Sequence, residues 1–162
     1  MDTSIRPFAL YPLDLDRATA GEAKRNLAQT FTAGATGMLD AVHLPIACVE
    51  GVQFRLQLRI GDPDGPLLYD RRYQPATHGK GGFLNLPVFG GVLIREGTVY
   101  ALVLSSAPVI GAGATCSIAA GPEGDPYAPG HAFQNVPGAT ADYWAPLSAS
   151  GRDDLPFRTV MR

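Results

Sequence analysis

The sequence predicts an all-β fold, an antiparallel β-sandwich of the jelly-roll type with about 8–10 strands. The segment from Gly51 to Ile60 alternates apolar residues with Gln and Arg, which is typical of a strand with one buried and one wet face. The chain holds 19 Gly and 14 Pro, and these residues favour turns and break helices. Short strand patterns recur between the turns, which favours a sandwich over an α/β fold.

Two segments are predicted in order along the chain, an N-terminal extension over residues 1–26 and a β-sandwich domain over residues 27–162. The extension lacks alternation and holds one helical turn around Ala18 to Leu27. Turn clusters such as AGATG, DPDG, GKGG and FGG separate the later segments. Strands are expected at 27–32, 38–48, 52–60, 66–73, 82–89, 92–95, 98–105, 114–119, 131–136 and 155–161.

Individual strands carry further detail. The apolar residues between Leu39 and Ile46 share one face only if a residue is inserted near Asp40, which predicts a β-bulge. The strand from Thr98 to Ser105 is apolar on both faces and is therefore predicted to be central. Arg55, Gln57 and Arg59 should lie on the solvated face of their strand. The predicted core comprises Phe31, Leu39, Val42, Leu44, Ile46, Val52, Phe54, Leu56, Leu58, Ile60, Tyr100, Leu102, Leu104, Leu155 and Phe157.

Bulk composition limits the partners. At 162 residues, with 46% hydrophobic and 17% charged residues, the chain suits one packed domain. A net charge of −2 without a basic patch argues against nucleic acid. The N-terminus MDTSIRPFALYPLDLD has no leader pattern, and no apolar run has the length of a membrane span. We expect synthesis without export and no membrane insertion, while the location, cytoplasmic or on a surface or particle, stays open.

The two cysteines, Cys48 and Cys116, both lie in apolar strand-like segments. Free cysteine behaves there as a small buried hydrophobe, so buried free thiols are expected, with a bridge between the two as the alternative.

Metal binding is considered first at the GDPDG turn. Asp62 and Asp64, with Asp70 nearby, could supply oxygen ligands to calcium. Asp and Gly are also the preferred residues of turns, and this interpretation is favoured. Asp153 and Asp154 could likewise be calcium ligands or ordinary loop residues. Because the second interpretation is favoured at both places, we expect no cofactor.

Catalytic patterns are weak. His43, His78 and His131 form no metal-binding pair, and Ser105 and Ser106 lack a nucleophile elbow. GKGG at 79–82 precedes no helix that would bind phosphate. The sequence therefore predicts no enzyme.

An aromatic segment offers the best binding signal. Sugars are recognised by a flat ring that stacks on a pyranose, with amide or carboxylate groups for the hydroxyls. For Trp144, the only tryptophan, packing in the core beside Phe133 is the favoured interpretation, and a binding role is the alternative. The candidate ligand-binding residues are Tyr127, His131, Asn135, Asp142, Tyr143 and Trp144.

Four segments carry a family resemblance, AQTFTAGATGMLDAVHLPI, VQFRLQLRIGDPDGPLL, REGTVYALVLSS and DLPFRTVMR. Together they resemble a jelly-roll accessory module common in bacterial surface, secreted and phage-associated proteins, which is similar to carbohydrate-binding modules. The resemblance extends over residues 28–162. It implies a non-catalytic binding or spacer role beside other activities.

We therefore expect a lectin-like, non-catalytic module with carbohydrate as its partner. The alternative is a structural or assembly subunit, such as a phage or particle component, built on the same sandwich. A closed homo-oligomer without ligand affinity would favour the assembly subunit, whereas a monomer with saturable sugar binding would favour the lectin-like module.

Overall fold

The structure is a computed structural model that describes residues 12–14, 26–48, 53–74, 83–106, 116–119, 128–135, 144–146 and 154–162. Every regular element in these ranges is a β-strand. The strands are β1 (Pro12–Asp14), β2 (Leu27–Thr32), β3 (Gly37–Leu44), β4 (Ile46–Cys48), β5 (Phe54–Ile60), β6 (Leu67–Tyr73), β7 (Leu84–Ile94), β8 (Val99–Ser106), β9 (Cys116–Ala119), β10 (Ala132–Asn135), β11 (Trp144–Pro146) and β12 (Arg158–Met161).

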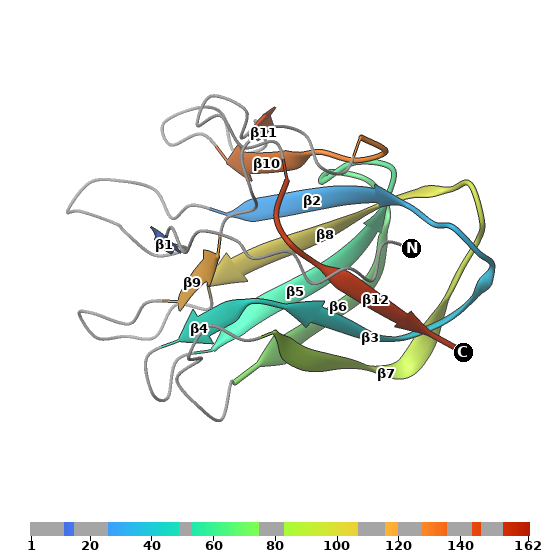
Figure 1. The fold of residues 1–162 in the computed structure, drawn as a ribbon, viewed down its shortest axis with the longest axis horizontal. Coiled ribbons are helices and arrows are strands. Elements are labelled where there is room, and N and C mark those ends of the chain that lie inside the picture. Colours follow the sequence, from blue (N-terminus) through green and yellow to red (C-terminus); the bar gives the residue numbers. More distant parts are fainter. Residues whose placement is uncertain are drawn as a thin grey trace.

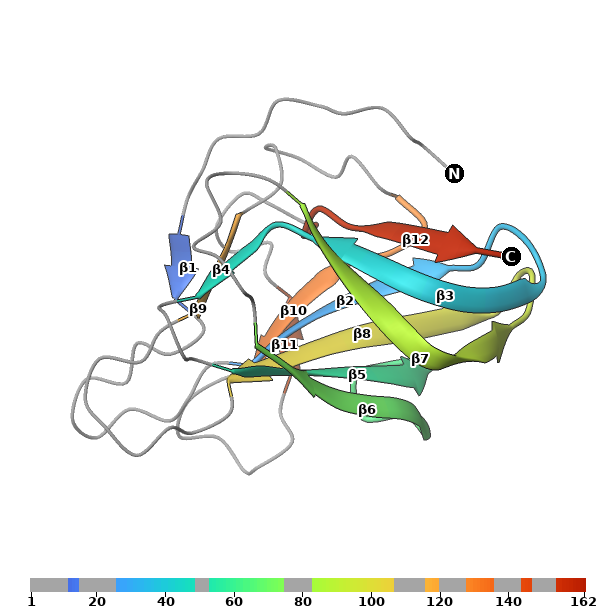
Figure 2. The same cartoon turned by 90° about the horizontal axis from the view of Figure 1, so that it is seen from below.

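Two antiparallel sheets form the body of the fold. The larger sheet has six strands in the order β11-β10-β2-β8-β5-β6, and the smaller has three in the order β12-β3-β7. In Figure 2, β12 and β3 lie above β8 and β5, and β7 descends obliquely across the view toward the level of β6. The predicted β-sandwich is confirmed. A third sheet, in the order β1-β9-β4, lies at one end of the sandwich (Figure 1).

The alternation in β5 has the predicted orientation. Phe54, Leu56 and Leu58 are buried, whereas Arg55, Gln57 and Arg59 lie on the opposite face. The prediction that Ile60 belongs to the core is wrong, because this residue is 37% exposed. It is the last residue of β5, beside the turn that leads to β6, so the layers no longer cover it.

Most of the predicted core is confirmed. Val52 lies outside the described residues, and Phe157 is only partly buried, packed against the core. The predicted residues that are buried between the two sheets are Phe31, Leu39, Val42, Leu44, Ile46, Phe54, Leu56, Leu58, Tyr100, Leu102, Leu104 and Leu155.

The irregularity predicted at Asp40 is confirmed as a register shift between Leu39 and Ala41. Leu39 pairs with Val92 and Ala41 pairs with Pro87, so most of the extra residues belong to β7. The sequence predicted two strands separated at FGG, but β7 continues through these residues. Gly90 and Gly91 have φ values of +83° and +68°, which glycine adopts without strain, and they keep the chain in the sheet.

The strand β8 is central, as its two apolar faces predicted. It lies between β2 and β5 in the six-stranded sheet. Tyr100, Leu102 and Leu104 face the sandwich core, while Ala101 and Val103 join a second buried cluster with Ala28 of β2. The outer face of this sheet therefore carries a small apolar cluster, formed by Ala28, Ala101 and Val103, and polar side chains along β5.

Two tyrosines of β6 connect the layers at one edge. The Tyr73 hydroxyl donates to the Pro87 carbonyl oxygen at 2.6 Å and lies 2.8 Å from the Tyr69 hydroxyl. The Phe89 backbone N–H donates to Tyr69 at 3.3 Å. Burial and the Tyr69 hydrogen bond raise the pKa of Tyr73, so its hydroxyl stays neutral and can donate to the Pro87 carbonyl oxygen.

The small sheet corrects two expectations. Pro12–Asp14, placed by the sequence in an extension without strands, pairs with β9. Cys116 is buried and disulfide-bonded, and Cys48, the only other cysteine, is its antiparallel partner in β4. The expected free thiol is therefore wrong at Cys116. Residues directly opposite in an antiparallel pair are close enough for a bridge, but local sequence does not reveal that pairing.

The predicted helical turn over 18–27 lies mostly outside the described residues, and Leu27 itself begins β2. The predicted boundary between residues 26 and 27 stays a prediction.

Candidate functional site

The indole of Trp144 contacts the turn between β5 and β6. Its Nε1–H donates to Oδ1 of Asp64 at 2.9 Å, although the two residues are 80 positions apart in the chain. The sequence singled out Trp144 for stacking and Asp64 for metal binding as separate candidates. The structure brings these two residues together.

Small side chains make room for the indole on the outer face of the six-stranded sheet. Ala28, Ala101 and Val103 are buried there, with Phe133 and Trp144 packed against them and themselves only partly buried. Trp144 thus packs against buried residues, as one of its two predicted roles required, and its role in ligand binding stays a prediction. One part of its surface packs on the sheet, and another part stays accessible to solvent.

A polar row lies next to this apolar patch. On the outer face, Ala101 and Val103 of β8 are the direct cross-strand partners of Arg59 and Gln57 of β5. Partners directly opposite in an antiparallel sheet have Cβ atoms about 4.5–5.5 Å apart. The aromatic patch and the polar row therefore form one continuous surface.

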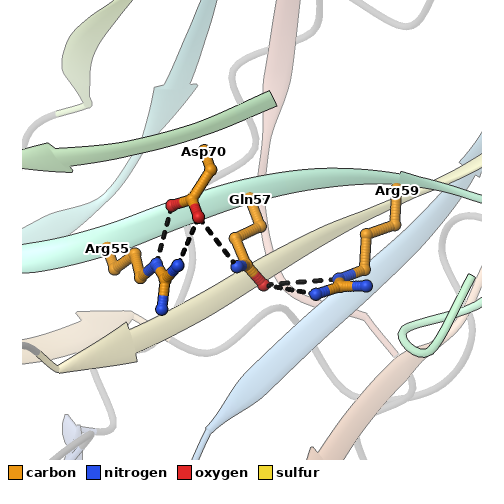
Figure 3. A network of polar contacts seen from close by, with 4 residues as sticks. All are labelled: Arg55, Gln57, Arg59 and Asp70. Atoms are coloured by element: carbon orange, nitrogen blue, oxygen red, sulfur yellow. Dashed lines mark hydrogen bonds and ion pairs between the residues drawn. The ribbon is translucent and has the colours of Figure 1, made fainter. Parts of the chain in front are cut away.

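Hydrogen bonds join the row from end to end (Figure 3). Arg55 binds the Asp70 carboxylate through two N–H groups, with Nε to Oδ1 at 2.6 Å. Gln57 Nε2 donates to Oδ2 of Asp70 at 3.2 Å, and Gln57 Oε1 accepts from Arg59 Nε and Nη2 at 3.3 and 3.1 Å. Each side chain of the row is held by its neighbour before any ligand arrives.

The turn after β5 anchors both parts of the surface. Asp64 accepts the indole N–H, and the carbonyl of the next residue, Gly65, accepts from Arg59 Nη1 at 2.9 Å. The turn is tight, because a Cβ on Gly65 would lie 1.7 Å from the Ile60 carbonyl oxygen. Only glycine fits there, so the turn fixes Trp144 and Arg59 relative to each other.

Electrostatics keep Asp70 ionised. The hydrogen-bonded Arg55 guanidinium is the main cause that lowers the pKa of Asp70; burial opposes it, and Gln57 and Arg59 lower it further. Because the folded-state pKa is depressed, the resulting stabilisation is complete above the ordinary carboxylate pKa. It is lost as pH falls through the folded-state value.

Removing the guanidinium should therefore raise the pKa of Asp70. We expect the Arg55→Gln variant to shift the Asp70 titration toward its ordinary value, measured from the carboxyl carbon in NMR spectra. Arg72→Gln is the matched control. Arg72 belongs to β6, as Asp70 does, but it is not a cause of the lowered Asp70 pKa. An unchanged Asp70 titration in Arg55→Gln would contradict this account.

The Asp62–Asp64 turn uses its carboxylates within the protein. Asp62 Oδ1 accepts from the Asp64 backbone N–H at 2.9 Å, and Asp64 Oδ1 accepts from Trp144. In the described ranges, no group of three or more His, Cys, Asp or Glu side chains could hold a metal. Asp154, the other acidic candidate, is buried and accepts from Gln29 Nε2 at 2.9 Å.

We expect calcium to have no effect on stability. A calcium site at one hundred times its dissociation constant would add about 2.7 kcal/mol to the free energy of unfolding. Thermal melts with excess calcium and with a chelator should give the same Tm. A chelator-induced decrease that disappears in Asp64→Ala would show that the turn does bind calcium.

Of the remaining predicted site residues, His131 and Asn135 lie in the described part of the chain. His131 is exposed, and its backbone N–H donates to Thr30 Oγ1 at 2.9 Å. Asn135 is the antiparallel backbone partner of Trp144, and its side chain is not described. Tyr127, Asp142 and Tyr143 lie outside the described residues.

Sequence reasoning missed the polar row as part of the site. Arg55, Gln57 and Arg59 were assigned to a solvated face, and Asp70 was considered only as a metal ligand. The available signal was the unbroken alternation of hydrogen-bonding residues along one strand.

Compared with known protein families, with curated proteins and with solved structures, the chain gives no match. The family resemblance of the four sequence segments therefore stays an interpretation of their pattern. Within the described ranges there is also no helix long and apolar enough to cross a membrane.

Proposed function

We propose that the outer face of the six-stranded sheet binds carbohydrate, as a non-catalytic module. The observation that carries the proposal is the fixed placement of a partly exposed indole beside a hydrogen-bonded polar row. An aromatic face stacks on the C–H groups of a sugar ring. Charged and amide groups next to that ring bind the hydroxyl groups.

The row offers both donors and acceptors. Asp70 is an ionised acceptor, whereas Arg55 and Arg59 provide guanidinium donors beyond those used inside the row. Because the side chains already hold one another, a ligand would lose less affinity to side-chain ordering than on a mobile surface. This combination suits a polyhydroxylated ligand better than a purely apolar one.

Affinity electrophoresis tests the proposal directly. Native gels containing hydroxyethylcellulose, xylan, galactomannan or polygalacturonate should retard the protein in at least one case. Trp144→Ala should abolish that retardation, and Trp144→Phe should restore part of it because a ring remains. Phe89→Ala is the control, since Phe89 is an exposed aromatic residue on β7 of the other sheet.

Folding must be measured in parallel. If Trp144→Ala is folded by circular dichroism and still binds as the wild type does, the indole is not part of a sugar site. If no polymer retards the wild type, the carbohydrate proposal is wrong.

A second candidate, a structural or assembly subunit, is favoured by exposed apolar side chains along one edge of the sandwich. Leu67 and Leu68 of β6 are 47% and 39% exposed, and Phe89 and Leu93 of β7 are 53% and 49% exposed. Light scattering separates the two proposals. A concentration-independent closed oligomer without glycan affinity supports assembly, whereas a monomer that binds glycan supports the first proposal.

A further inference from the structure

We infer that the ligand of this surface is an extended chain of several sugars that runs along β5, and not a single terminal sugar. The inference rests on the proposed carbohydrate function and concerns the same surface. It follows from the length of the polar row and from the position of Trp144 at one end of it.

The row is longer than one sugar. Side chains two apart on a strand are separated by about 6.6–6.8 Å on the same face, so Arg55 and Arg59 are about 13 Å apart along β5. Figure 3 shows Arg55 and Arg59 at the two ends, with Asp70 and Gln57 between them. The spacing of about 13 Å is the separation of the two positions along the strand, and it exceeds the length of a single pyranose ring, so one ring cannot cover the whole row.

The indole marks the end at which the first sugar binds. Trp144 and Arg59 are anchored to consecutive residues of the β5–β6 turn, Asp64 and Gly65. A ring stacked on Trp144 would therefore be next to Arg59 and remote from Arg55. Contacts with the distant half of the row require further sugars in the chain.

The half of the row that is remote from Trp144 has N–H donors that are free to bind a ligand. The Arg55 side chain is 44% exposed, and its two bonds to Asp70 use two of its five N–H donors. Arg72 of β6 is exposed and is the direct cross-strand partner of Arg55. Two guanidinium groups thus lie at the end away from Trp144, where a single stacked sugar would leave them unused.

Calorimetry with a length series tests the inference. The probes are oligomers of one to six units from the polymer that retards the protein most in the gels. The affinity of the wild type should rise by about tenfold or more from one unit to four. Arg59→Gln should weaken binding at every length, whereas Arg55→Gln should weaken binding of the longer oligomers only.

Arg71→Gln provides the matched control, because Arg71 belongs to β6 but lies over the Phe89 ring, 4.1 Å from its centroid. It should bind every oligomer as the wild type does. Equal affinity for one and for four units would overturn this inference and leave the proposed function standing. Retardation by no polymer at all would overturn the proposed function as well.

Discussion

Replacing Phe54 by alanine should lower the free energy of unfolding by about 3–5 kcal/mol. Phe54 is 0% exposed, at the start of β5. Its ring stacks on Tyr73 with centroids 5.8 Å apart and an interplanar angle of 22°. The substitution removes buried apolar surface, leaves a cavity and loosens the tyrosine that bonds to β7.

The same substitution at Phe89 is the control. Phe89 is 53% exposed, and the Arg71 guanidinium lies over its ring, 4.1 Å from the centroid. A cation–π contact at such a site is worth about 0.5–1 kcal/mol, so Phe89→Ala should be only slightly less stable than the wild type. Urea unfolding followed by circular dichroism measures both variants. Equal losses of unfolding free energy in the two variants would show that Phe54 is not the buried and Phe89 not the exposed residue of the pair.

Gln29→Leu should cost about 2–5 kcal/mol of unfolding free energy. Gln29 is 1% exposed on β2, and its side chain connects this strand to the segment before β12. Its Nε2 donates to Asp154 at 2.9 Å, and its Oε1 accepts from the Leu155 backbone N–H at 2.6 Å. Leucine removes both groups and leaves buried polar atoms with fewer partners.

Gln53→Leu tests whether glutamine itself matters. Gln53 is only partly buried, and its amide makes one exposed contact with Gln74 at 3.4 Å. Its replacement should change stability by about 0.5 kcal/mol or less. If Gln29→Leu were as stable as Gln53→Leu, the buried connection to Asp154 would have no stabilising role.

Local pattern was sufficient for most of the fold. Alternation in β5 assigned Phe54 and Arg55 to opposite faces, because successive side chains of a strand point to opposite sides. The interrupted pattern around Asp40 located the register shift for the same reason. The apolar faces of β8 placed that strand inside a sheet.

Errors arose where the outcome depends on partners distant in sequence. The FGG segment reads as a turn, but β7 pairs with β3 on both sides of this segment and continues through it as one strand with a register shift. Cys116 reads as a free thiol, since nothing local shows that Cys48 lies opposite it. Ile60 continues the alternation, yet the core ends before it.

The candidate site was only half predictable. Trp144 and Asp64 each attracted attention, but their hydrogen bond spans 80 residues and depends on how the sheet is assembled. The polar row of β5 was visible as a pattern. Its bonding to Asp70 required knowledge of the register between β5 and β6, in which Gln57 is opposite Asp70.

The proposed carbohydrate function requires that Trp144 contact a glycan on the outer face of the six-stranded sheet. Trp144 is the only tryptophan of the chain, so fluorescence reports on this side chain alone. We expect saturating polysaccharide to shift its emission and to protect it from quenching by acrylamide. Suppose instead that a polymer retards the protein in a gel but leaves both the emission and the quenching of Trp144 unchanged. That result would show that Trp144 does not contact the glycan.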